Sequence, residues 1–198
     1  MKEKIILASR SNVRKKILKE NSIDCDVLPA DINEDEIKNS LIAEGANPML
    51  ISKNLAELKS VKISNKILNK IVLGADSVIN LDGELISKPK DRQEALLILQ
   101  KLNGKKHNLI SSVCISKNGS MIWNFTDTSN LTMKKLSDDE IKIYLSKIKD
   151  EALYAYNVYQ IEGLGRSLFS KIEGNENTIM GLPVKEIKEY LNSMGANK

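Results

Sequence analysis

The sequence predicts an α/β fold with a mixed central sheet flanked by helices, in one domain spanning residues 1–198. Short apolar runs such as 71–73 suit strands buried on both faces, and they alternate with longer segments of helical periodicity. The dipeptides Asp82-Gly83 and Asn118-Gly119 are strong hairpin signals, so antiparallel pairs are expected beside helical crossovers. A chain of 198 residues is long enough for one sizeable core, and no repeat or linker divides it.

The first predicted unit is a strand, a turn and a helix. The strand is expected over 4–7, and the small polar turn after it contains Ser9. Ser11 suits the N-cap of a helix over 12–20, because its hydroxyl can accept from a free backbone amide. Free amides and a positive dipole favour an anion at a helix start. The turn is therefore either a phosphate cradle or an ordinary capped helix with Arg14 in water.

A second strand is expected over 23–28, and the acidic run 31–36 then marks the start of a helix that ends near Gly45. Pro48 begins a further helix. The apolar residues expected to face the core from this helix are Leu50, Ile51, Leu55, Leu58 and Val61. Lys59 lies beside this stripe, so its side chain is expected at the edge of the packed face.

A predicted hairpin over 71–81 and 84–86 carries two opposite charges. Asp76 lies on its first strand, and Lys88 follows its second. Opposite charges held on a rigid sheet are typical of a functional site. The alternative is that Asp76 only caps or turns the backbone while Lys88 is solvated.

Six further elements are predicted after this hairpin. They are a helix from Asp91 to Leu102, strands over 107–116 and 120–133, a helix with a capping box over 137–148, a strand over 167–172 and a last helix that starts near Pro183. The segment 154–166 contains three of the five tyrosines, together with Gln160 and Glu162. His107, the single histidine, is expected to make a structural hydrogen bond, because no Ser or Cys partner for catalysis is visible.

Composition argues against several classes of protein. The formal net charge is +4, and no basic stripe with interleaved aromatics occurs, so binding to nucleic acid is not expected. One histidine and no Cys-x-x-Cys pair argue against structural zinc. Cys25 and Cys114 are expected to be free, buried thiols in a reducing compartment. No run suits a signal peptide or a membrane span, so a cytoplasmic protein is expected, and a homodimer is left open beside a monomer.

The polar residues singled out along the chain share one chemistry. Those that can contact phosphate are Ser9, Arg14, Lys59 and Lys88. Two carboxylates, Glu34 and Asp76, can hold a divalent cation or activate water. Together these groups suit metal-assisted attack of water on a phosphoanhydride.

Eight short motifs occur in order along nearly the whole chain. They are Leu7-Ala8-Ser9-Arg10-Ser11, Leu55-Ala56 with Lys59, Gly74-Ala75-Asp76-Ser77, Lys88-Pro89, Gly104 with His107, Tyr159 to Gly165, Ile172-Glu173-Gly174 and Gly181-Leu182-Pro183. Each motif is weak alone, but the ordered set resembles the Maf family of nucleoside triphosphate pyrophosphatases. The loop 159–165 is similar to the branch of that family that reads Y-Q-L-E-G-L-G.

The resemblance implies two lobes around a deep cleft, with a strongly twisted, ITPase-like sheet. It implies hydrolysis of a standard or modified nucleoside triphosphate to the monophosphate and pyrophosphate, with Mg²⁺ or Mn²⁺ as cofactor. Asp76 matches the proton acceptor, a metal ligand or both, with Lys59 and Lys88 beside it as catalytic cations. Glu34 matches a metal or water partner. The positions that match substrate binding are Ser9, Arg14 and Gln160.

Two departures from the family pattern concern the substrate. The commoner form reads S-P-R-R, whereas this chain reads Ser11-Asn12-Val13-Arg14, so one arginine is missing. The loop with Gln160 also follows the less common branch, and a broader or shifted nucleotide range is expected. The resemblance also implies an alternative, a nucleotide-binding regulator of cell division with little hydrolysis. An intact Asp76 favours the enzyme, because binding alone does not need this carboxylate.

Overall fold

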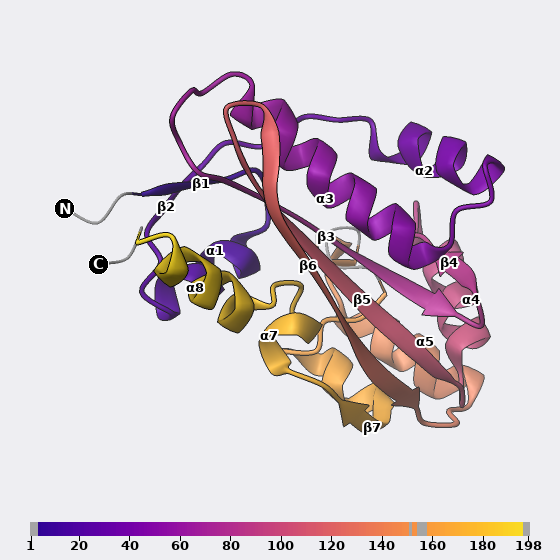
Figure 1. The fold of residues 1–198 in the computed structure, drawn as a ribbon. Coiled ribbons are helices and arrows are strands. Elements are labelled where there is room, and N and C mark those ends of the chain that lie inside the picture. The colour runs from indigo at the N-terminus through magenta and orange to yellow at the C-terminus, as the bar shows by residue number, and fades with distance from the viewer. Residues whose placement is uncertain (1–3, 151, 154–157, 196–198) are drawn as a thin grey trace.

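A computed structural model describes residues 4–150, 152–153 and 158–195, and a seven-stranded sheet runs through it (Figure 1). The strands are β1 (Ile5–Leu7), β2 (Cys25–Val27), β3 (Val72–Leu81), β4 (Glu84–Ile86), β5 (Lys106–Lys117), β6 (Ser120–Met133) and β7 (Phe169–Glu173). Their order is β2-β1-β3-β5-β6-β7, and β4 also pairs with β3. The pairs of β1 with β2 and with β3 are parallel, and the others are antiparallel. The predicted mixed α/β sheet is confirmed.

Helices lie on both faces of this sheet. They are α1 (Asn12–Glu20), α2 (Glu34–Ala43), α3 (Pro48–Ser64), α4 (Arg92–Leu102), α5 (Asp138–Lys147), the 3-10 helix η1 (Leu164–Leu168), α7 (Glu176–Ile179) and α8 (Val184–Ser193). In Figure 1, α3 follows one side of the sheet, and α1 and α8 lie together on the other. Alternation along the strands explains both layers. Val72 packs with Ile63 of α3, whereas its neighbour Leu73 packs with α1 and α8.

Capping and turn residues set the element boundaries. Helix α1 follows Ser11, whose hydroxyl accepts from the Arg14 amide, and α5 follows Ser137 with a complete capping box, as predicted. The turn at Asp82-Gly83 has φ values of 51° and 92°, the left-handed pair that a tight hairpin needs. The sequence did not predict η1 and α7, because helices of five and four residues are too short to show a period. Residues 154–157 of the tyrosine-rich segment lie outside the described residues.

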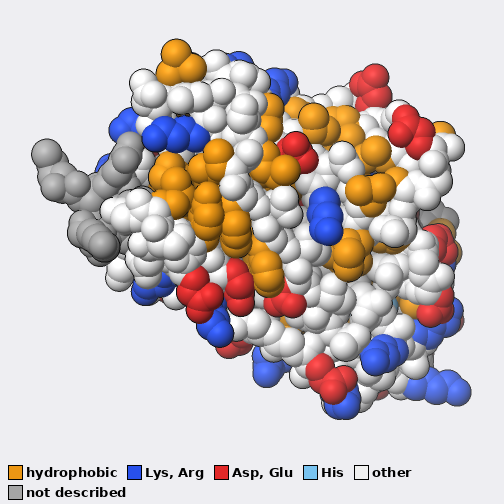
Figure 2. Space-filling view, viewed as in Figure 1, with side chains coloured by type: hydrophobic (Ala, Val, Ile, Leu, Met, Phe, Trp, Pro, Cys, Tyr) orange, Lys and Arg blue, Asp and Glu red, His pale blue; other side chains and the backbone are white. Residues whose placement is uncertain are grey.

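The stripe expected on α3 is wrong at two of its five positions. Leu50 and Leu58 are 47% and 42% exposed, and Val61 is only half-buried, while Ile51 and Leu55 are buried as expected. Figure 2 shows hydrophobic side chains exposed on this face, in the region where α3 runs. The positions that meet the sheet in their place carry the small side chains of Ser52, Ala56 and Ser60.

Helix α3 lies very close to β3. A Cβ atom on Gly74 would stand 2.1 Å from the carbonyl oxygen of Ala56 and 2.7 Å from the amide nitrogen of Ser60. Only a residue without a side chain fits at this crossing, which explains the small residues on the facing side of the helix. The close approach brings Lys59 down to the sheet. No helix in the described part of the chain is both long and apolar enough to cross a lipid bilayer.

Candidate active site

The site lies where one edge of β3 has no strand partner. The other edge of β3 pairs with β5 from Val72 to Asn80. On the site's edge, β1 pairs only as far as Leu73, and β4 pairs only from Ile79. On this edge, residues 74–78 therefore have no strand beside them among the described elements. A pocket of about 740 Å³ opens at this gap.

All seven residues predicted for the site line this pocket. They are Ser9, Arg14, Glu34, Lys59, Asp76, Lys88 and Gln160. They come from the turn after β1, from α1, α2, α3 and β3, from the chain just past β4, and from the loop before η1. The fold thus brings together side chains that lie up to about 150 residues apart in the sequence, and their individual roles stay predictions.

Asp76 and Lys59 form a buried ion pair in the pocket. The two residues are 5% and 7% exposed, and Lys59 Nζ lies 2.8 Å from Asp76 Oδ1. The same Nζ lies 2.8 Å from Glu34 Oε1, so one ammonium bridges two carboxylates. The second oxygen of Asp76, Oδ2, is also buried, and it has no hydrogen-bond partner among the described residues. A buried carboxylate oxygen without a partner is costly, so it marks a position for a ligand, a metal ion or a water molecule.

Glu34 stands in the first turn of α2, where the helix dipole favours a carboxylate. Burial raises its pKa, but the charges of Lys59 and Lys38 outweigh burial and hold the pKa below its ordinary value. Lys38 was missed in the sequence. It is nearly buried, lines the pocket and pairs with Glu34 at 3.9 Å. Its spacing of four residues from Glu34 on one helix face was the signal that could have found it.

Arg14 has the most hydrogen bonds of the pocket side chains. Its Nε donates to the carbonyl of Gly181, Nη1 donates to the hydroxyl of Ser9 and the carbonyl of Ala75, and Nη2 donates to the hydroxyl of Ser77, at 2.9 to 3.2 Å. A guanidinium has five N–H groups, so one is left to reach a phosphate. Burial lowers the pKa of Arg14, and the charges of Asp76 and Glu34 oppose this shift. Arg14 therefore holds the pocket wall together as well as supplying charge.

Lys88 follows β4 and lines the same pocket. Loss of hydration lowers the pKa of its amine, and the charge of Glu34 opposes the shift. Ser9 accepts two hydrogen bonds, from Arg14 and from the Ser11 amide. Its hydroxyl proton is left to donate to a ligand. The predicted phosphate contacts thus gather around Asp76 in the middle of β3.

The loop before η1 and several apolar side chains also line the pocket. Gln160 lies on this loop, and its Nε2 donates to Glu162 Oε1 at 2.9 Å. Tyr159, Leu109 and Ile179 line the pocket too, and sequence reasoning missed all three as pocket residues. Such a surface, mostly apolar with a few polar groups, is typical of a site for a small organic group.

A divalent metal ion fits the donors of this pocket only in part. The described residues contain no group of three or more His, Cys, Asp or Glu side chains that can hold a metal. Asp76 Oδ2 is buried and has no partner among the described residues. Glu34 is close to Asp76, because both carboxylates contact the ammonium of Lys59. Mg²⁺ usually takes one or two carboxylates and completes its shell with water and phosphate oxygens. The chemistry of the two carboxylates fits an ion that arrives with a phosphorylated ligand.

His107 makes the structural hydrogen bond that the sequence predicts. Its Nε2 lies 2.9 Å from the hydroxyl of Tyr159, and both residues are buried. Burial lowers the pKa of His107 to about 4, so the ring is neutral near pH 7.

Comparison with known proteins found a matching family model, similar sequences and similar solved structures. A family model described as Maf-like protein matches residues 4–194. A nucleoside triphosphate pyrophosphatase of Pelagibacter ubique is 65% identical over 191 residues, which are 96% of this chain and 98% of that protein. A 7-methyl-GTP pyrophosphatase of Brucella abortus is 36% identical over 93% of this chain and 92% of its own length. A solved dITP/XTP pyrophosphatase from Mycobacterium abscessus shares 14% identity, with a TM-score of 0.43 over 96% of this chain and 94% of its own.

Proposed function

This chain belongs to the Maf family, and from that premise we propose that it hydrolyses a nucleoside triphosphate to the monophosphate and pyrophosphate. One observation carries the proposal. The pocket that gathers Arg14, Lys59 and Lys88 also holds a buried, unpartnered carboxylate oxygen of Asp76. A protein that only bound phosphates would gain nothing from a carboxylate there, because like charges repel. A protein that activates water needs such a group.

In the proposed step, water attacks the α-phosphorus and the bond from that phosphorus to the bridging oxygen breaks. The proton of the water passes to Asp76 Oδ2, and pyrophosphate leaves with the bridging oxygen. Lys59 holds Asp76 through Oδ1, which leaves Oδ2 for this role. Lys88 and Arg14 offset the charge that develops on the leaving group. Attack at the α-phosphorus rather than the γ-phosphorus follows from where the pocket positions the chain of phosphates.

Mg²⁺ or Mn²⁺ is the proposed cofactor, and Asp76 and Glu34 would hold it. Such an ion lowers the pKa of a bound water and screens phosphate charge. Whether Asp76 accepts the proton, ligates the ion or does both is tested by ion binding. Electron paramagnetic resonance measures how tightly the protein binds Mn²⁺. If both residues are ligands, Asp76→Asn and Glu34→Gln should each bind the ion more weakly than wild type.

The activity test uses the pure protein with Mg²⁺ or Mn²⁺ and a panel of standard and methylated nucleoside triphosphates. The panel includes 7-methyl-GTP, because a similar protein is named a 7-methyl-GTP pyrophosphatase. Chromatography should find the monophosphate and pyrophosphate. Diphosphate with orthophosphate, or no turnover of any nucleotide, would overturn the proposal.

We also propose that the substrate is a free nucleotide rather than nucleic acid and that the protein works in the cytoplasm. The free thiols Cys25 and Cys114 support a reducing compartment. Light scattering tests whether the protein is a monomer or a homodimer.

A further inference from the structure

The two ends of the pocket suit two different parts of a nucleotide. The cations Arg14, Lys59 and Lys88 gather around Asp76 in the middle of β3, where the phosphates belong. Tyr159 instead contacts His107, which is next to the β5 residue that pairs with Asn80 near the end of β3. The nucleoside then lies against the loop that contains Tyr159 and Gln160. How firmly this loop is held therefore decides how well a nucleoside is bound and distinguished.

The buried side chain of His107 forms a hydrogen bond with this loop. His107 stands on β5, is 2% exposed and shares a hydrogen bond of 2.9 Å with the Tyr159 hydroxyl. Tyr159 is the residue before Gln160, and its ring packs edge-on against Phe169 at 4.8 Å. Burial raises the pKa of Tyr159, so its hydroxyl keeps its proton. The hydrogen bond therefore joins two neutral groups in a dry environment, where it cannot be exchanged for water at low cost.

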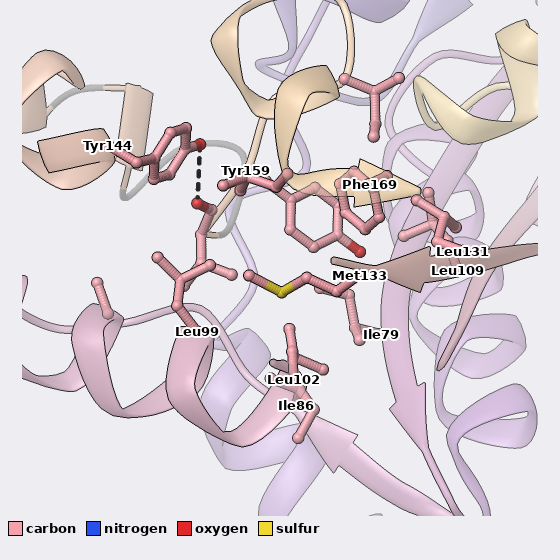
Figure 3. Packing of buried hydrophobic residues seen from close by; sticks show 14 of the residues in the cluster. Ile79, Ile86, Leu99, Leu102, Leu109, Leu131, Met133, Tyr144, Tyr159 and Phe169 are labelled. Atoms are coloured by element: carbon pink, nitrogen blue, oxygen red, sulfur yellow. Dashed lines mark hydrogen bonds between the residues drawn. The ribbon is translucent and has the colours of Figure 1, made fainter. Parts of the chain in front are cut away.

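Two further contacts hold the same loop. The Tyr144 hydroxyl donates to the carbonyl of Val158 at 3.2 Å, the bond drawn as a dashed line in Figure 3. On the other side, a Cβ atom on Gly165 would stand 2.6 Å from the backbone nitrogen and oxygen of Gln160. Among these contacts, the one from His107 acts on the residue directly beside Gln160.

We propose that His107 is a positioning residue that holds Gln160 against the nucleoside through the hydroxyl of Tyr159. The proposal rests on the proposed function. His107 acts through Tyr159 in this arrangement, because Tyr159 lines the pocket and His107 is not among its lining residues. Removing the hydrogen bond should therefore loosen the nucleoside end of the pocket and leave the phosphate end unchanged.

The test measures the two products of the reaction as separate ligands by calorimetry in the presence of Mg²⁺. The nucleoside monophosphate reports on the loop, and inorganic pyrophosphate reports on the cation end. The monophosphate used is the product of the nucleotide that the protein hydrolyses fastest. If no nucleotide is hydrolysed, the monophosphates of the whole panel are measured. The variants are Tyr159→Phe, His107→Leu and His107→Gln, which keeps a hydrogen-bonding group. Tyr190→Phe is the matched control, because it also loses a single tyrosine hydroxyl bond but does not line the pocket.

Tyr159→Phe and His107→Leu should bind the monophosphate about 5- to 10-fold more weakly, as expected for one lost hydrogen bond. Their affinity for pyrophosphate should stay within about twofold of wild type, as should both affinities of Tyr190→Phe. His107→Gln should recover most of the loss. In steady state KM should rise more than kcat falls.

Unchanged monophosphate binding in Tyr159→Phe, or equally weakened binding of both products, would overturn the proposal. Absence of turnover with this binding pattern intact would contradict the proposed function alone.

Discussion

The two oxygens of the Asp76 carboxylate have different surroundings. Oδ1 accepts from Lys59, and Oδ2 has no partner among the described residues. Asp76→Asn should keep the contact with Lys59, since an amide oxygen still accepts a hydrogen bond. It should lose the ability to take the proton of the attacking water at the position of Oδ2. We expect turnover to fall by at least about 10²-fold, the usual scale for removing a general base.

The melting temperature of Asp76→Asn should stay near that of wild type, and phosphate binding should not weaken, because a negative charge has left. Asp82→Asn is the matched control, since Asn-Gly suits the same tight turn. Near-normal turnover with a lowered melting temperature would mean that Asp76 is structural.

Val13 and Arg14 are neighbours with opposite roles. Val13 packs against the cluster formed by α1, α8 and the sheet, whereas Arg14 bonds the pocket wall. Val13→Arg should destabilise the protein by about 1–3 kcal/mol, the usual range for overpacking. Arg14→Ala should abolish activity and also lower the melting temperature, because four hydrogen bonds are lost. Denaturant unfolding and turnover measure both. The assignment of this turn to the phosphate site is wrong if Val13→Arg is as stable as wild type and Arg14→Ala is active.

His107 makes stability depend on pH in a definite window. Its pKa in the folded protein, about 4, lies below the ordinary value of 6.5, so the unfolded chain binds more protons between these values. Stability is therefore full above about pH 6.5 and falls as the pH is lowered toward 4, by at most about 3 kcal/mol from this group. Tyr159 and Tyr144, which lie near it, are neutral throughout. Unfolding of His107→Gln should show a smaller loss over this window, and an identical slope would contradict the assignment.

At the scale of elements, the approach of α3 to β3 sets the position of Lys59. Gly74→Ala should force the helix away from the sheet and destabilise the protein by about 1–3 kcal/mol. The folded fraction should also lose activity, because Lys59 moves from Asp76. Thermal unfolding measures the first effect, with Gly163→Ala as control, since its nearest heavy atoms stand 3.7 Å away. Equal melting temperatures for the two variants would show that the crossing has room.

Sequence reasoning was accurate where local chemistry decides and weaker where packing decides. Ser11 and Asp91 placed the starts of α1 and α4 to the residue, because a cap is read from the chain itself. The buried face of α3 was misjudged because Leu50 and Leu58 were expected inside on grounds of hydrophobicity. The close crossing at Gly74 admits only small side chains, and no period in the sequence of α3 contains that information.

At the scale of the whole molecule, all seven predicted residues line the pocket. They were chosen for their chemistry and for the family resemblance, and their contacts with one another could not be foreseen. Lys38 and Tyr159 line the same pocket and were missed, since each is defined by what packs beside it. The bonds that fix Arg14 were also invisible in sequence. Three of its acceptors lie on β3 or beyond residue 180. Long-range partners of this kind follow only from topology.

The bond from Arg14 to Gly181 has a consequence for biosynthesis. Its two partners are 167 residues apart, so the arginine leaves the ribosome long before its acceptor is made. Until these last segments are made, the inner face of α1 lacks Ile187 and Leu191, and the pocket lacks the lining that Ile179 and Gly181 supply. Stalled nascent chains that end at residue 175 should therefore be sensitive to protease and should not hydrolyse nucleotides. We therefore expect hydrolysis of nucleotides to begin only after translation has passed Gly181.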